Sequence, residues 1–118
     1  MQTRVIAVVT YGLPDNTDRA TAVQMFRDSI PRYRATPGLL CKNVLYRDGL
    51  GGGIYLWESR AAADAAYSDE WKAYMTAKYD HPPQIVFYEC PITIDNQHDA
   101  VADEALGTHG SALSAAAD

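Results

Sequence analysis

The sequence has few of the residues on which metal, disulfide and nucleophile chemistry depend. It contains two cysteines, Cys41 and Cys90, and three histidines that are scattered along the chain. A metal site needs such ligands at close spacing, and a nucleophile elbow and a usable Cys–His pair are also absent. We therefore expect no metal and no cofactor, and we expect both cysteines to be buried, reduced thiols.

Long apolar runs and an excess of basic charge are missing as well. No stretch approaches the roughly 18 apolar residues of a membrane span, and the N-terminus lacks the features of a signal peptide, so the sequence predicts a cytoplasmic protein. From Asp95 onward there are five of the fifteen acids and no Lys or Arg, which leaves ten acids and ten bases in residues 1–94. A neutral body with an acidic tail has no basic surface for phosphate groups, so we expect neither nucleic acid nor membrane as a partner.

Hydrophobic residues make up 47% of the 118 residues, which is enough for one compact domain with a core. Runs of β-branched residues predict strands over residues 3–11, 39–47, 53–58 and 84–94. A helix capped by Thr17 or Asp18 follows the first strand, and helices capped by Ser59 and Ser68 follow the third. Residues 48–53 predict a flexible hairpin connection. Because this glycine run leads into a strand, a phosphate-binding loop is excluded.

The first helix carries an apolar stripe at three- and four-residue steps, predicted to be buried: Ala22, Val23, Phe26, Ile30 and Tyr33. Pro31 is expected to kink this helix or to end it early, because proline lacks the N–H that a helix interior needs. The flanking Arg27, Arg32 and Arg34 are expected to be solvated.

The element order predicts an α+β, ferredoxin-like βαββαβ domain over residues 1–96, with a four-stranded antiparallel sheet, of the dimeric α/β-barrel kind. The usual strand order places the second and fourth strands at open edges, so a homodimer that covers them is expected. Residues 97–118 are acidic and rich in Ala, Gly and Ser, which predicts a disordered tail. The alternative is a short helix over residues 101–106 that docks on the partner.

Four segments carry a resemblance to a known family: Pro37–Lys42 (PGLLCK), Gly52–Trp57 (GGIYLW), Ser68–Trp71 (SDEW) and Cys90–Asn96 (CPITIDN). Over about residues 3–96 the chain resembles the YdhR-like monooxygenases, a branch of the dimeric α/β-barrel group. Another branch degrades haem and carries a Trp and a His on the second helical segment. Ala65 and Met75 stand at those places here, so haem chemistry is not expected.

The resemblance and the absence of cofactor motifs favour a cofactor-independent monooxygenase acting on a small aromatic or polyketide-like substrate. Such an enzyme needs a proton acceptor, donors for an oxyanion and a dry apolar chamber. The alternatives are a non-oxidative isomerase or cyclase in the same pocket, or a non-catalytic dimer that binds a small hydrophobic molecule.

Eight tyrosines against two phenylalanines indicate hydroxyls that need partners in a core or a pocket. His81, which lies in the predicted domain and titrates near neutral pH, is the first candidate for the general base. Lys42 is predicted either to bind an oxyanion or to protect an edge strand, and Tyr74 completes the catalytic candidates. The substrate-binding candidates are Trp71, Tyr55, Trp57, Tyr11, Asn43 and Tyr88.

Overall fold

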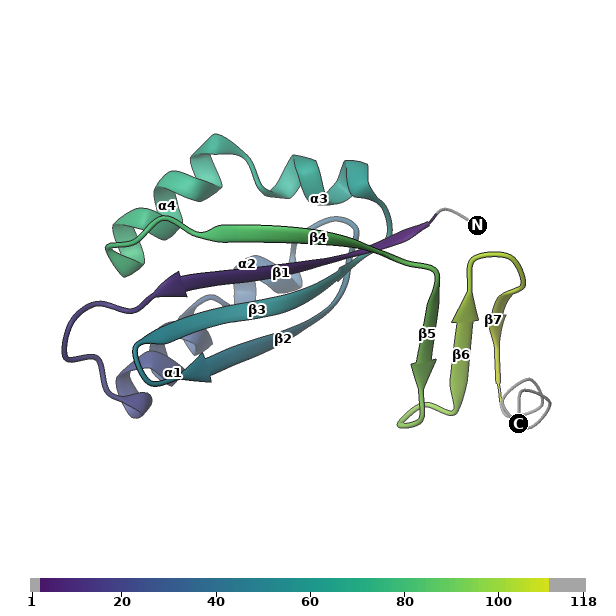
Figure 1. Cartoon of the computed structure of the whole chain (residues 1–118), viewed down its shortest axis with the longest axis horizontal. Coiled ribbons are helices and arrows are strands. Elements are labelled where there is room, and N and C mark those ends of the chain that lie inside the picture. The colour runs from purple at the N-terminus through teal and green to yellow at the C-terminus, as the bar shows by residue number, and fades with distance from the viewer. Residues whose placement is uncertain (1–2, 111–118) are drawn as a thin grey trace.

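Four long strands form one antiparallel sheet, and helices cover one of its faces (Figure 1). The computed structural model describes residues 3–110. The strand order is β2-β3-β1-β4, with the bounds Arg4–Gly12 (β1), Leu39–Arg47 (β2), Leu50–Trp57 (β3) and Gln84–Cys90 (β4). The predicted α+β class with a four-stranded antiparallel sheet is thus confirmed. The second and fourth strands lie at its two edges, as expected.

Four helices follow the first and third strands, and three of them begin where the sequence supplies a capping side chain. Their bounds are Arg19–Asp28 (α1), Ile30–Arg34 (α2), Arg60–Ala66 (α3) and Asp69–Tyr79 (α4). Asp18, Ser59 and Ser68 accept hydrogen bonds from backbone N–H groups in the first turns of α1, α3 and α4. None of the helices within residues 3–110 is long and apolar enough to cross a membrane.

The first helical segment breaks at Ser29, and Pro31 lies in the first turn of α2. Proline is tolerated there because the first N–H groups of a helix have no intrahelical acceptor. The predicted effect of Pro31 is therefore confirmed. Ile30, which was expected in the buried stripe, is instead 53% exposed.

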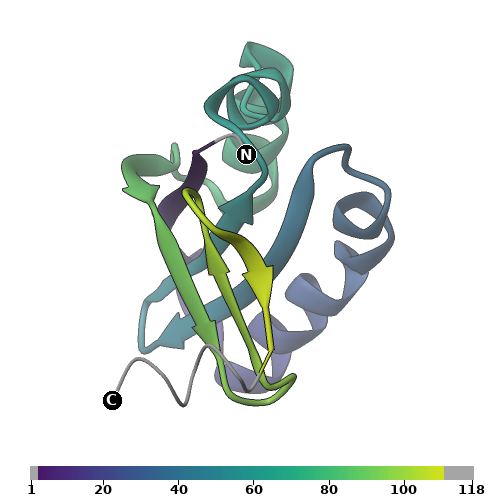
Figure 2. The ribbon, with the colours of Figure 1, turned by 90° about the vertical axis from the view of Figure 1, so that its right-hand side faces the viewer.

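The alternation along β1 shows which face of the sheet is covered. Val5, Ala7, Val9 and Tyr11 are buried under the helices, whereas the residues between them are only partly buried. On the opposite face none of the helices within residues 3–110 lies over the strands (Figure 2). Val86 and Tyr88 of β4 are 51% and 57% exposed there.

The glycine run belongs to a strand rather than to a long connection, which corrects the prediction for residues 48–53. The turn is formed by Asp48 and Gly49 alone, and β3 begins at Leu50. A Cβ on Gly52 would lie 2.2 Å from the carbonyl oxygen of Val9 in β1. Glycine is used here because the neighbouring backbone approaches too closely for a side chain.

A second, three-stranded sheet corrects the prediction of disorder over residues 97–110. It consists of β5 (Ile92–Asp95), β6 (Ala100–Asp103) and β7 (Gly107–His109), and it projects from the end of the long sheet (Figure 1). It also excludes the alternative helix over residues 101–106. Residues 111–118 lie outside the described part of the chain.

Local turn chemistry explains why residues 92–109 form strands despite their polar composition. The Asp95 carboxylate accepts hydrogen bonds from the N–H groups of Gln97 and His98, and Asp103 does the same for Ala105 and Leu106. Such bonds close tight turns between strands. The break between β4 and β5 lies at Pro91, which cannot donate a ladder hydrogen bond.

The two cysteines differ from the prediction of buried thiols. Both are free, but Cys41 is exposed and Cys90 is half-buried. Cys41 pairs with Leu56 on the face of the sheet that the helices leave open, so its side chain points to solvent. The two cysteines belong to β2 and β4, which form the two opposite edges of the sheet. This separation agrees with the prediction that the thiols are not paired with each other.

Candidate functional site

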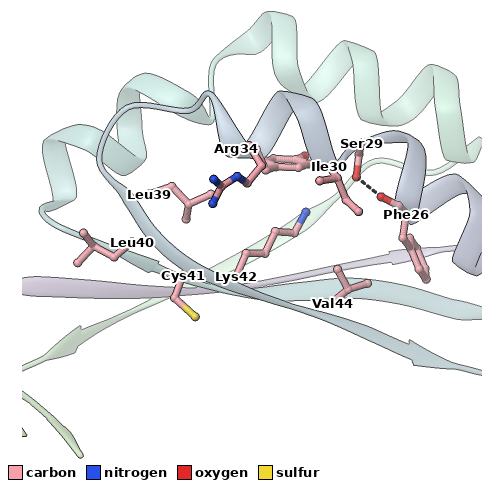
Figure 3. Close-up of a pocket in the computed structure, with 10 residues that line it drawn as sticks. Phe26, Ser29, Ile30, Arg34, Leu39, Leu40, Cys41, Lys42 and Val44 are labelled. Carbon is pink, nitrogen blue, oxygen red and sulfur yellow. Dashed lines mark hydrogen bonds between the residues drawn. The ribbon is translucent and has the colours of Figure 1, made fainter. Parts of the chain in front are cut away.

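A cavity of about 300 Å³ lies between β2 and the α1–α2 pair (Figure 3). Its lining comes from the end of α1, from α2 and from the first half of β2. The residues that line it are Phe26, Ser29, Ile30, Tyr33, Arg34, Leu39, Leu40, Cys41, Lys42 and Val44. This lining contains two basic groups and no acid, and most of the rest is apolar. The cavity can therefore take a small molecule with an apolar body and an anionic or electrophilic group.

Lys42 extends from β2 into this cavity, and its nitrogen points toward α2 (Figure 3). It pairs with Tyr55 in the sheet, which places its side chain on the helix-covered face. Nζ lies 3.4 Å from the ring centroid of Tyr33 and 4.5 Å from that of Tyr55. Within residues 3–110, Lys42 forms no salt bridge. Gly53 makes room for the side chain, because a Cβ there would lie 3.0 Å from Cε of Lys42.

Burial lowers the pKa of Lys42 to about 7, and the positive charge of Lys78 contributes further. The two aromatic faces oppose this effect, since a cation over a ring is stabilised by about 0.5–2 kcal/mol. Desolvation costs an unpaired ammonium several kcal/mol and is therefore the larger effect. A substantial fraction of Lys42 is a neutral amine at neutral pH, which can accept a proton or attack an electrophile.

A smaller cavity of about 10 Å³ adjoins Lys42 on the side of α4. This volume is close to the minimum for a single water molecule. Tyr11, Tyr74, Lys78 and Tyr79 are among its lining residues. Burial raises the pKa of the Tyr11 and Tyr79 hydroxyls, so both remain protonated and can donate hydrogen bonds.

Lys78 is engaged by the protein, in contrast to Lys42. Its Nζ donates to the carbonyl oxygen of Met25 at 2.8 Å and lies 3.5 Å from the Tyr74 hydroxyl. The structure thus brings three of the predicted site residues, Lys42, Tyr11 and Tyr74, around one small cavity. Tyr74 also carries the guanidinium of Arg32 over its ring at 3.9 Å.

Three predicted pocket aromatics are instead packed into a filled cluster. Trp57 and Tyr55 are 0% and 1% exposed and stack with ring centroids 6.0 Å apart. The Trp57 indole donates to the Tyr67 hydroxyl at 3.0 Å, and Tyr67 packs against Trp71 at 4.8 Å. None of the three predicted residues lines the cavities at Lys42. Tyr55 still contributes to the site, because its ring is the second aromatic face near Nζ of Lys42.

Asn43 and Tyr88 lie on the other side of the sheet. Asn43 pairs with Ile54, and Tyr88 pairs with Ile6, both of which face away from the helices. Successive side chains of a strand point to opposite faces, so the Asn43 side chain is directed away from that of Lys42. Neither Asn43 nor Tyr88 lines the two cavities at Lys42. These two predicted substrate-binding residues are therefore not brought together with the others.

His81 is exposed at the end of α4 and is separate from the Lys42 cavity. Its Nδ1 lies 3.0 Å from the carbonyl oxygen of Tyr79, and its ring packs against Gly12. It borders a wide, polar hollow formed by the loops after β1 and β2. The predicted catalytic pair of His81 and Lys42 is thus not assembled within the subunit.

A wider hollow of about 570 Å³ lies between the β2 entry turn and α3. Small alanines and the single carboxylate of Glu58 dominate its lining. It lacks the convergent polar groups that mark a ligand site.

Solved structures with a similar fold include two bacterial proteins. NE2512, a protein of unknown function from Nitrosomonas europaea, aligns with a TM-score of 0.61 at 17% identity, over 75% of this chain and 90% of that chain. Protein SO0527 from Shewanella oneidensis aligns with a TM-score of 0.57 at 15% identity, over 76% of this chain and 93% of that one. No family model and no curated protein matches the chain. These similarities establish the fold alone, and the resemblance to YdhR-like monooxygenases stays a prediction.

Sequence reasoning missed three residues of the site. Tyr33 carries the ring nearest to Lys42, and its hydroxyl accepts a hydrogen bond from the Trp71 indole at 3.0 Å. Arg34 is exposed and lines the larger cavity. Lys78 lines the smaller cavity on the inner side of Lys42. The available signal was Pro31, because a helix that breaks above an edge strand leaves part of that strand uncovered.

Proposed function

We propose that the chain is a cofactor-independent monooxygenase that acts on a small aromatic or polyketide-like substrate, with Lys42 as the proton acceptor. The observation that supports it is the Lys42 amine, which has a pKa of about 7 and stands without a carboxylate partner at a cavity of about 300 Å³. A general base is most effective when its pKa is close to the working pH. Lys42 replaces His81 in this role because His81 borders a different hollow.

In the proposed reaction a phenol- or anthrone-like substrate loses a proton to Nζ of Lys42. The resulting anion transfers one electron to O₂, and the radical pair combines to form a carbon–oxygen bond. Loss of water from the peroxide then leaves one oxygen atom on the substrate as a carbonyl group. The new ammonium of Lys42 and the hydroxyls of Tyr11 and Tyr74 stabilise the developing oxyanion.

Oxygen consumption by metal- and flavin-free protein tests this proposal. With a panel of anthrones and hydroquinones, Lys42→Met is expected to lower the rate by about 100-fold or more, as loss of a general base does. Lys72→Met is the matched control, because Lys72 is exposed on α4. The rate should also increase through pH 7 as the amine loses its proton. Equal rates for the two variants would contradict the role of Lys42.

The same assay separates the alternative functions. Product formation without oxygen consumption would indicate a non-oxidative isomerase or cyclase. Saturable binding with unchanged ligand, unaffected by Lys42→Met, would indicate a binding protein without catalytic activity.

We further propose that the fold is the ferredoxin-like, dimeric α/β-barrel kind, with the open sheet face covered by a second copy of the chain. Val86 and Tyr88 on this face are 51% and 57% exposed, and large apolar residues seldom remain so exposed together on a monomer. Sedimentation analysis should show a dimer. Val86→Asp should shift it toward the monomer, whereas a substitution in the Lys42 cavity should not.

A further inference from the structure

We infer that the cavity at Lys42 takes small carbonyl compounds that also carry a carboxylate, and that the Lys42 amine joins them covalently as an imine. This inference rests on the proposed function, since it concerns the same site and names the class of its substrate. The arrangement that supports it is a half-buried lysine without a carboxylate partner, together with an arginine at the same apolar cavity.

The surroundings of Lys42 favour a nucleophilic amine. A lysine attacks a carbonyl carbon only in its neutral form, which burial and the nearby Lys78 charge both favour by lowering the pKa of Lys42 to about 7. No acid lines either of the two cavities that Lys42 borders, so no carboxylate there holds the ammonium. Tyr33 and Tyr55 restrict the side chain from two sides, which limits the orientations of Nζ.

Arg34 supplies the specificity for an anionic group. It lines the same cavity from the last turn of α2, and its guanidinium and the Lys42 amine both face that cavity (Figure 3). Among residues 3–110 it forms no salt bridge, so its charge is available to a ligand. Guanidinium binds carboxylate through two parallel hydrogen bonds. Ile30, Leu39 and Val44 leave an apolar space between these two groups for the body of the ligand.

The covalent step needs no further reactant. The lone pair of Nζ forms a bond to the carbonyl carbon, the two N–H protons of the neutral amine pass to the carbonyl oxygen, and this oxygen leaves as water. A proton from solvent converts the imine into the iminium. Hydrolysis reverses the step. The iminium draws electrons from the neighbouring carbon, so a C–H bond there loses its proton more easily. With the amine bound in the imine, Nζ of Lys42 no longer serves as the proton acceptor, so imine formation and proton abstraction are two alternative uses of the same group.

Reductive trapping tests the inference on the full chain under nitrogen. The probe is 4-formylbenzoate with cyanoborohydride, and its neutral methyl ester is the comparison. The chain has three lysines, Lys42, Lys72 and Lys78, so peptide mapping by mass spectrometry locates the adduct unambiguously. We expect Lys42 to be modified at least ~10-fold faster than the other two, because burial lowers its pKa to about 7 and its amine faces the cavity.

Two matched pairs of variants test the roles of the side chains. Lys42→Arg should abolish the fast adduct, whereas Lys72→Arg should leave it. Arg34→Gln should slow trapping of the formylbenzoate by about 10-fold and leave the ester unaffected, as loss of one charge-assisted pair predicts. Arg27→Gln is the control, because Arg27 is exposed on α1 and does not line the cavity.

The outcomes separate the inference from the proposed function. Trapping at Lys42 without oxygen consumption supports the imine site and removes the oxygenase. Oxygen consumption that depends on Lys42, without preferential trapping there, overturns the inference and leaves Lys42 as a base. Equal modification of the three lysines in the wild-type protein overturns the inference. Because this comparison needs no variant, the result does not depend on whether the variants fold.

Discussion

The two helix pairs cover the same face of the sheet in different ways. The α3–α4 pair places large aromatic rings directly on β3, so that Trp57, Tyr67 and Trp71 fill the space between the layers. The α1–α2 pair breaks at Ser29 and leaves Val44 of the edge strand 47% exposed beside a cavity. The half of the domain under α3 and α4, which we call the filled half, therefore supplies stability. The half under α1 and α2, the open half, has room for a ligand.

This difference shows how a small domain can hold a reactive amine. The Lys42 side chain is desolvated by the rings of Tyr33 and Tyr55, which the filled half keeps in place. The Tyr33 hydroxyl accepts the Trp71 indole N–H, so it links α2 to α4. Weakening the filled half should therefore affect the whole domain, whereas changes in the open half should act mainly on Lys42.

The largest expected effect is that of Trp57→Ala. Trp57 is fully buried, and its removal should lower the free energy of unfolding by about 3–5 kcal/mol. Val44→Ala, on the same face of the sheet but in the open half, should cost less than about 1 kcal/mol because Val44 is 47% exposed. Urea denaturation measures both, and similar losses for the two variants would contradict the distinction between the halves.

The next effect depends on pH. The pKa of Lys42 falls from 10.5 to about 7 on folding, so between these values the unfolded chain binds more protons and stability rises with pH. Lys42→Met removes this contribution. The variant should be more stable than the wild type at pH 6, and the difference should shrink as the pH rises from 7 toward 10.5. Denaturation curves at pH 6, 8 and 10 measure it, and a constant difference would show that Lys42 is not desolvated.

Tyr33→Phe tests the link between the halves. It keeps the ring below Lys42 but leaves the Trp71 indole without its acceptor, which should cost about 1–3 kcal/mol. Tyr88→Phe on the open sheet face is the control and should change stability by less than about 0.5 kcal/mol. If both variants unfold at the same urea concentration, the bond between Tyr33 and Trp71 contributes nothing measurable.

Gly53→Ala should have the smallest effect on stability and a clear effect on the site. The added Cβ would lie 3.0 Å from Cε of Lys42 and 3.0 Å from the Tyr55 ring. Because the lysine chain is flexible, it can move aside, and the stability should change by less than about 1 kcal/mol. Its displacement should slow reductive trapping at Lys42 several-fold. Unchanged trapping would show that Gly53 does not position the amine.

Much of the fold could be predicted because the signals are local. Asp18, Ser59 and Ser68 cap helices through bonds to N–H groups three residues further on, so the sequence alone shows where α1, α3 and α4 begin. The buried face of β1 could not be predicted in this way, because apolar residues stand on both faces of that strand and only the structure shows which face the helices cover. The second sheet was missed because overall composition outweighed the turn-forming Asp95 and Asp103.

The candidate site was predicted only in part, since its members come from separate elements. Lys42, Tyr11 and Tyr74 were identified by residue type, and the structure places them at one cavity. His81 was chosen because histidine titrates near neutral pH in water. That reasoning could not anticipate that Lys42 would have a pKa of about 7, because desolvation depends on which rings surround the amine.

The sequence by itself determined where the capped helices begin, where Pro31 interrupts them, and that an α+β domain with a four-stranded antiparallel sheet results. The helix starts and the interruption depend on contacts between residues a few positions apart, and the strands were identified from their own residue types. Only the tertiary structure decided that Trp57 and Trp71 are filled core and that Lys42 borders an open cavity. Whether a side chain packs solidly or faces a cavity depends on the elements that cover it, and those elements lie far away in the chain.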